Sequence, residues 1–124
     1  MAISATHIEQ AKGVVTSQWL ALNKNSGATS GTALDAPHLP DKCVEVSGTF
    51  SGATLVIEGH NSSTATGGTY QTLNDSRGEG NALSFTAANI VQILENTRFI
   101  RPRLTTATGS PSLNVRIVSQ SVGR

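Results

Sequence analysis

The sequence contains one cysteine, Cys43, among its 124 residues, so no disulfide can form within the chain. Its apolar runs fall far short of the roughly 20 residues that a helix needs to span a bilayer. The amino-terminal stretch also lacks the basic-then-apolar pattern of a secretion signal. These absences predict a protein that is made and kept in a reducing, soluble compartment, with no membrane partner.

Charged and aromatic residues are scarce. Charged residues make up 14% of the chain, below the usual quarter, and aromatic residues make up 4%. Ser, Thr, Asn and Gly take their place, which favours an all-β protein with many turns. Single-strand nucleic-acid binders interleave basic residues with stacking aromatics, and only Phe99 stands among the carboxy-terminal arginines. The sequence therefore predicts no nucleic-acid partner.

The residue types used in catalysis are present, but they form no recognisable motif. The three histidines lie far apart and in no metal-ligand spacing. The stretch Gly48–Ala53 holds two glycines but joins two predicted strands, so it indicates a hairpin turn rather than a phosphate loop. Glu45 and Glu58 are expected to face solvent on neighbouring strands. The sequence predicts no enzyme, no cofactor and no metal site.

The central segment Cys43–Leu73 contains three short runs in which polar and apolar residues alternate. Val44 and Val46 share one face of the first run, and Leu55 and Ile57 share one face of the second. Successive side chains of a strand point to opposite sides, so period-two alternation predicts strands. Gly- and Ser-rich breaks separate the runs and supply turn chemistry. We predict a β-meander in which each run pairs with the next.

The same alternation predicts further strands on either side of this meander. They cover residues 12–22, a short piece at 32–34, and residues 82–86, 98–105 and 113–118. For residues 90–94 a strand and a helical turn both remain open, and so does the question of which face of the strand containing Trp19 is buried. About eight short strands at regular spacing predict one domain over residues 14–124, an antiparallel β-sandwich of jelly-roll type.

Four stretches of the chain resemble small virion proteins of tailed phages, namely VEVSGTFSGATLVIEGHNSS, GTYQTLND, GNALSFTAANI and TRFIRPRLTTATGSPSLNVRI. The pattern is that of the jelly-roll decoration, or cement, proteins that sit as trimers on phage capsids. The resemblance covers roughly Cys43–Val118. The loop Gly59–Gly68 departs from it, because it lacks the acidic residue and the tryptophan of the pattern.

The resemblance implies a non-enzymatic virion structural protein that is made in the host cytoplasm and assembles as a homotrimer. It would bind the outer capsid surface and stabilise the head by bridging neighbouring subunits of the major capsid protein. The alternative is a tail or fibre β-sandwich module that binds a host-surface glycan. Glycan-binding sandwiches usually need exposed aromatic platforms, so the scarcity of aromatics favours the first function.

Residues 1–13 form a lead-in for which the pattern predicts no regular structure. Ile3 and Ile8 supply apolar side chains with no evident partner inside a sandwich. We interpret this segment as an arm that contacts a neighbouring copy or the capsid, and the alternative is a frayed terminus. On the arm hypothesis, deleting residues 1–11 would weaken particle binding and leave the melting temperature nearly unchanged.

Residues 97–124 contain five arginines and no carboxylate, although the net charge of the chain is only +1. Arg101 and Arg103 are two residues apart in a predicted strand and should share a face, which Arg116 could join from a neighbouring strand. Arginine binds carboxylates through two parallel hydrogen bonds. We predict that these arginines meet acidic groups on a capsid subunit or another copy, and that Gln at 101 and 103 together leaves the fold intact. The alternative is that they are ordinary solvated strand residues.

Overall fold

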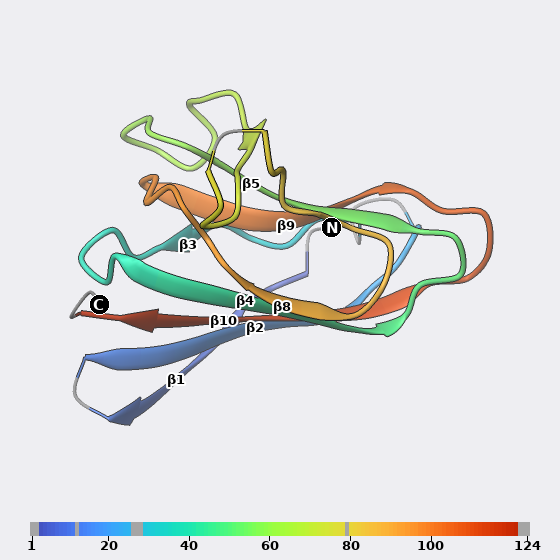
Figure 1. Cartoon of the computed structure of the whole chain (residues 1–124), viewed down its shortest axis with the longest axis horizontal. Helices are drawn as coiled ribbons and strands as arrows, with labels where there is room; N and C mark the ends of the chain where they lie inside the picture. The colour runs from blue at the N-terminus through green and yellow to red at the C-terminus, as the bar shows by residue number, and fades with distance from the viewer. Residues whose placement is uncertain (1–2, 12, 26–28, 79, 122–124) are drawn as a thin grey trace.

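The computed structural model describes residues 3–11, 13–25, 29–78 and 80–121, and it is a two-layer β-sandwich (Figure 1). Every pair of neighbouring strands within the sheets is antiparallel. The predicted all-β sandwich is confirmed, and the described residues form ten strands in place of about eight. In this part of the chain no helix is long and apolar enough to cross a membrane.

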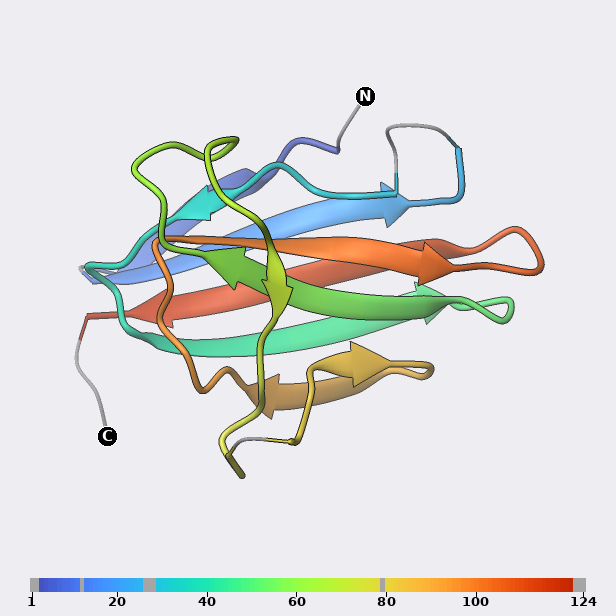
Figure 2. The ribbon, with the colours of Figure 1, turned by 90° about the horizontal axis from the view of Figure 1, so that it is seen from above.

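Each layer is one sheet, and the two layers lie face to face (Figure 2). The first sheet contains, in spatial order, β1 (Thr6–Ala11), β2 (Val14–Leu22), β10 (Ser112–Gln120), β4 (Asp41–Thr49) and β8 (Asn89–Gln92). The second sheet contains, in spatial order, β3 (Leu34–Asp35), β9 (Phe99–Thr106), β5 (Thr54–His60) and β6 (Gln71–Thr72), and β7 (Ser84–Phe85) also pairs with β5.

The chain passes from one sheet to the other at most of its connections. Strands β2, β4, β8 and β10 lie in the first sheet, and the intervening β3, β5, β6, β7 and β9 lie in the second. This alternation gives the double-sheet arrangement of a jelly roll, with β1 as an additional strand at one edge. Strand β8 also settles the alternative left open for residues 90–94 in favour of a strand.

The predicted meander is wrong at its first step, because β4 and β5 lie in opposite sheets. The turn between them crosses the sandwich edge. Gly52 in this turn and Gly48 near the end of β4 adopt positive φ angles of 78° and 113°. The second step is confirmed, since β5 pairs with β6. Alternation of polar and apolar residues shows which face of a strand is buried, but it does not show which other strand pairs with that strand.

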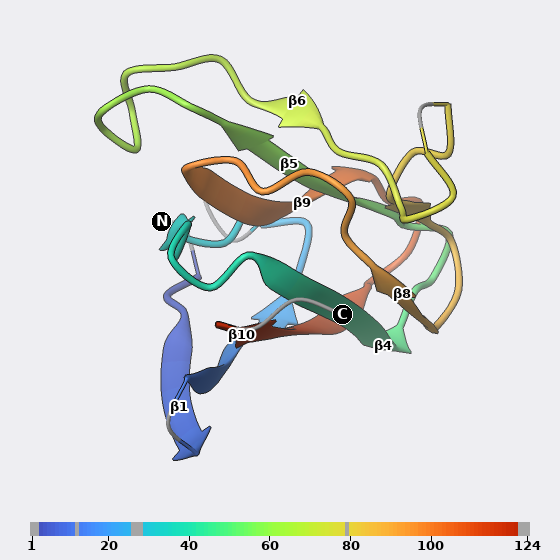
Figure 3. The same ribbon diagram turned by 60° about the vertical axis from the view of Figure 1, so that its left-hand side comes forward.

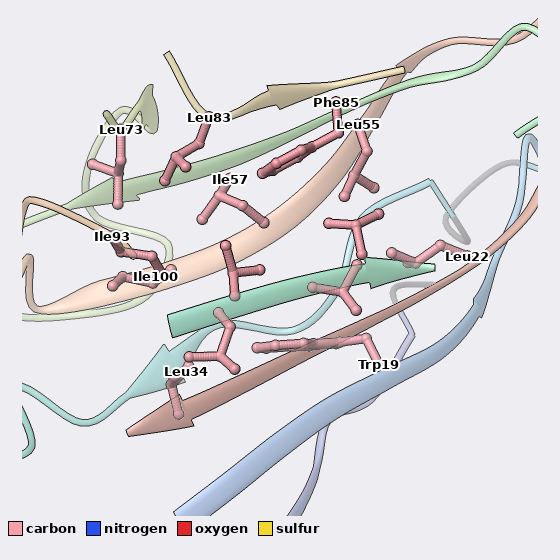
Figure 4. Close-up of a cluster of buried hydrophobic side chains, with 14 of the residues drawn as sticks. Trp19, Leu22, Leu34, Leu55, Ile57, Leu73, Leu83, Phe85, Ile93 and Ile100 are labelled. Carbon is pink, nitrogen blue, oxygen red and sulfur yellow. The ribbon is translucent and has the colours of Figure 1, made fainter. Parts of the chain in front are cut away.

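The core lies between the two sheets and is filled by side chains from both (Figure 4). Each fully buried Val, Leu, Ile or Phe side chain stabilises the fold by about 1.5–3 kcal/mol. Trp19 has no exposed surface, and its Nε1 donates a hydrogen bond of 2.9 Å to the Thr32 carbonyl. The face of β2 that contains Trp19 and Ser17 therefore points inward.

The lead-in contains strand β1, which pairs with β2 at the edge of the first sheet (Figure 3). Ile8 lies opposite Thr16 in this pair, Ile3 bridges to Gly31, and Ile3 and Ala5 pack against the core. The segment therefore has the partners inside the sandwich that the sequence did not reveal. An edge strand buries little apolar surface, so its residues carry only a weak alternating signal.

Candidate partner-binding face

Arg101 and Arg103 project from the outer face of the second sheet, as the sequence predicts. Their neighbours in β9, Ile100 and Leu104, are buried on the inner face. Strand β5 places Glu58 directly opposite Arg101. Arg101 Nε donates to Glu58 Oε1 at 2.8 Å, and Arg103 Nε donates to Oε1 and Oε2 at 3.0 and 3.1 Å.

Glu58 is a buried carboxylate, with 3% of its side chain exposed. The expectation that Glu58 faces solvent is therefore wrong. The expectation that Glu45 and Glu58 lie on neighbouring strands is also wrong, because Glu45 lies on β4 in the other sheet. A buried charge is tolerated only when opposite charges and hydrogen bonds compensate for the lost water. The two arginines therefore have a structural role, since together they compensate the Glu58 charge.

The cluster of Glu58, Arg101 and Arg103 carries one positive charge in excess. The Nε atoms point toward Glu58, and within the described part of the chain the Nη atoms of both arginines make no hydrogen bond. The side chains of Arg101 and Arg103 are 28% and 39% exposed. The outer parts of both guanidinium groups can thus accept an additional carboxylate from another molecule.

Tyr70 fixes the orientation of Arg101. The Arg101 Cζ atom lies 3.8 Å from the centroid of the Tyr70 ring, a cation–π contact. The Tyr70 hydroxyl donates to the Ala65 carbonyl at 3.2 Å. Burial raises the pKa of Tyr70, and the Glu58 charge adds to this while Arg101 opposes it. Arg101 is thus held in place by a ring on one side and a carboxylate on the other.

His60 supports this face from the end of β5. Its ring packs edge-on against Tyr70, with 4.3 Å between centroids, and 7% of the residue is exposed. The Ser62 backbone N–H donates to Nδ1 at 3.1 Å, so the ring proton is assigned to Nε2, which donates to the Ala65 carbonyl at 2.8 Å. His60 and Tyr70 together hold the loop after β5 against the sheet.

A polar hollow of about 600 Å³ lies beside this loop, and no sequence pattern predicts it. Asn61, Gln71 and Thr97 are among the side chains that line it. Its one lining carboxylate, Glu95, accepts hydrogen bonds from the Asn74 backbone N–H at 2.7 Å and from Asn74 Nδ2 at 2.6 Å. Among the described residues, no group of three or more His, Cys, Asp or Glu side chains is placed to hold a metal ion.

The other predicted site residues lie elsewhere. Arg116 does not join Arg101 and Arg103, because β10 belongs to the first sheet and Arg116 projects from the opposite side of the sandwich. Ile8 lies on that same outer face and is 43% exposed, whereas Ile3 is half-buried against the core. The structure thus places Arg116 and Ile8 on the surface opposite to that of Arg101 and Arg103, and Ile3 against the core.

Comparisons with known proteins add one structural relative. No protein-family model matches this sequence, and no curated protein sequence matches it. The chain is similar to the crystal structure of the SPBc2 prophage-derived protein YomS, with a TM-score of 0.55 and 11% sequence identity. The match covers 90% of this chain and 98% of that protein. At this identity the likeness shows a shared fold.

Proposed function

We propose that this chain is a non-enzymatic structural protein of a phage particle. It binds the outer surface of the capsid as a homotrimer and stabilises the head by bridging neighbouring subunits of the major capsid protein. The resemblance over Cys43–Val118 and the fold shared with a prophage-derived protein support this proposal. The observation that carries it is the outward-facing guanidinium pair of Arg101 and Arg103, which is suited to acidic groups on a partner.

The physical mechanism is preferential binding to the assembled lattice. A protein that binds only the assembled state lowers its free energy by mass action. An exposed arginine–carboxylate pair contributes only about 0–1 kcal/mol, so one such contact per chain would be weak. Many copies on a symmetric particle, each bridging subunits, multiply that contribution through effective concentration.

The test of this proposal needs a variant that removes the arginine pair without damaging the fold. Gln at positions 101 and 103 alone would leave Glu58 buried without a cation, which costs about 3–5 kcal/mol. We therefore expect the double variant to be destabilised, in place of the intact fold that the sequence predicts. The triple variant Glu58→Gln, Arg101→Gln, Arg103→Gln removes the buried charge together with its partners.

Particles prepared from the source of the gene and stripped of this chain are incubated with each variant, and occupancy is measured at several salt concentrations. We expect the triple variant to melt near the parent temperature and to attach more weakly and with less salt dependence. Lys24→Gln is the control, because Lys24 is exposed and its loss changes the net charge by the same amount. Equal occupancy and equal salt dependence of triple variant and parent would contradict the proposal.

A second candidate function is a tail or fibre module that binds a host-surface glycan. The polar hollow beside His60 favours it, because amide and hydroxyl side chains line a space large enough for a sugar. Binding of the purified protein to a glycan array, reduced by Gln71→Ala but not by the triple variant, would support this function in place of capsid attachment.

A further inference from the structure

The outer face of the first sheet is hollowed, with a volume of about 400 Å³, and its rims are apolar. Ile8 on β1 forms one rim and Ile90 on β8 forms the other, with exposures of 43% and 60%. Between them, Thr16 and Val118 lie in register across β2 and β10. Exposed isoleucines on both sides of a concave sheet face indicate a surface that is covered by another molecule.

Two opposite charges lie in the middle of this face. Arg116 and Glu45 are direct neighbours on β10 and β4, and their side chains are 40% and 44% exposed. Their closest atoms, Arg116 Nη1 and Glu45 Oε1, are 3.9 Å apart, too far for a hydrogen bond. Arg116 instead uses its Nε to bind Gln18 Oε1 at 3.1 Å. Both charged groups therefore keep hydrogen-bonding capacity for a partner.

Among the residues that line the hollow, one is positively charged and one is negatively charged, so this surface is complementary to a copy of itself. In a two-fold contact every pair of residues occurs twice: if Arg116 of one copy touches Glu45 of the other, then Glu45 of the first copy touches Arg116 of the second. We infer that this face binds a second copy of the chain, sheet against sheet, with Arg116 of each copy paired to Glu45 of the other. A partner with charge of one sign would leave either Arg116 or Glu45 facing a like charge.

The size of the face agrees with such a contact. Five strands spaced about 4.8 Å apart and up to nine residues long at about 3.3 Å each give a face of roughly 24 by 30 Å. Because β1 and β8 are shorter, on the order of 600 Å² per copy would be covered, somewhat below the roughly 800 Å² per partner of a standard stable interface. The expected result is a dimer that forms in the micromolar range.

The contact does not rest on the proposed attachment to the capsid, because it uses the first sheet and leaves Arg101 and Arg103 on the second sheet uncovered. It conflicts with one part of the proposed function, the homotrimer that the resemblance to decoration proteins implies, because it predicts two-fold association. The mass of the assembly in solution distinguishes the two.

Charge reversal followed by mixing provides the test. Sedimentation equilibrium of the full chain over a range of concentrations should give a dimer. We expect R116E and E45R each to weaken self-association by at least about tenfold, because each replaces two attractive contacts with two repulsive ones. An equimolar mixture of R116E and E45R should associate again, since one chain then offers two carboxylates and the other two guanidinium groups. A change in contacts within one chain could not be repaired by mixing.

The apolar rim is tested with a matched pair of substitutions. Ile90→Gln removes a rim side chain and should weaken self-association several-fold. Leu94→Gln is the control, because Leu94 is 47% exposed on the same stretch of chain but does not line the hollow. Both variants should melt near the parent temperature, so a selective effect of Ile90→Gln would come from the contact.

Four results would overturn the inference. They are a parent protein that stays monomeric at high concentration, an assembly with the mass of three chains, an R116E variant that associates like the parent, and a mixture that does not associate. Loss of particle attachment by R116E without any dimer in the parent would assign the face to a capsid partner instead. The triple variant at 58, 101 and 103 should dimerise normally, so failure of the proposed function would leave this inference intact.

Discussion

Lys42 is buried at one end of the sandwich, with 1% of its surface exposed. Its Nζ donates to the carbonyl oxygens of Ala36 and Leu39, at 2.9 and 2.7 Å, and to the side-chain oxygen of Asn96. All three acceptors are uncharged. Burial lowers the pKa of Lys42 from its ordinary value of 10.5 to about 8. The ammonium group joins two loops, but burial makes its charged form less stable in the folded state than in water.

This burial predicts a pH dependence of stability. Between about pH 8 and 10.5 the unfolded chain keeps the Lys42 proton and the folded chain does not, so the free energy of unfolding rises with pH. The gain in the free energy of unfolding from this deprotonation is fully present above about pH 10.5 and is lost as the pH falls through about 8. It reaches about 3 kcal/mol at most. Urea unfolding at several pH values, with Lys42→Met as the reference, measures it. Parallel pH profiles for parent and variant would show that burial does not shift this group.

Gly31 packs against the only tryptophan of the chain. A Cβ atom at this position would lie 2.3 Å from Trp19 Cδ1, so Gly31→Ala must displace the ring or the backbone. We expect a loss of about 1–3 kcal/mol, typical of overpacking a core. Urea unfolding followed by Trp19 fluorescence gives the magnitude. A variant as stable as the parent would mean that the segment preceding Thr32 can move away without cost.

The residues that the sequence placed correctly share one property: local alternation determines their orientation. Val44, Leu55 and Ile57 are buried on the apolar faces that the pattern defines. Glu58 was misjudged because its burial depends on two arginines that are more than 40 residues away in the chain. No local pattern contains that information, and an outward-facing carboxylate in a strand is ordinarily exposed.

At the scale of elements, residues 6–11 form strand β1, where the sequence predicts no regular structure. Deleting residues 1–11 would leave the edge of β2 unpaired and would remove the contacts of Ile3 and Ala5 with the core. We therefore expect the deletion to lower stability by about 1–3 kcal/mol and the melting temperature by several degrees. Thr6→Ser is the control, because it keeps the strand and changes only an exposed side chain that does not line the hollow on the first sheet. An unchanged melting temperature after the deletion would restore the arm hypothesis.

The pairing of elements was the part of the fold that the sequence could not supply. Alternation predicted most of the long strands and their buried faces, yet it paired β4 with β5 and grouped Arg116 with Arg101 and Arg103. Both errors have the same origin, because neighbours in sequence are assigned to one sheet by default. A jelly roll sends consecutive strands to opposite sheets, so sequence proximity misleads there.

For the whole molecule, the two arginine-containing faces point away from each other on opposite sheets. Sites that are well separated and share no partner usually contribute additively to free energy. We expect R116E combined with the triple variant at 58, 101 and 103 to show the self-association of R116E alone and the particle attachment of the triple variant alone. Calorimetry should give a loss of stability close to the sum of the separate losses. A combined effect well beyond that sum would indicate that the two sheets are coupled through the core.

The position of β10 has a consequence for how the chain folds. This strand lies between β2 and β4, so residues 112–120 join two segments made long before them. Until those residues have left the ribosome, β2 and β4 each lack a neighbour within the first sheet. The first sheet therefore cannot be completed before residues 112–120 are available, and such long-range pairing is slow. The nascent chain passes through a period in which unpaired strand edges are open to aggregation, and during that period it depends on dilution or on chaperones to remain in solution.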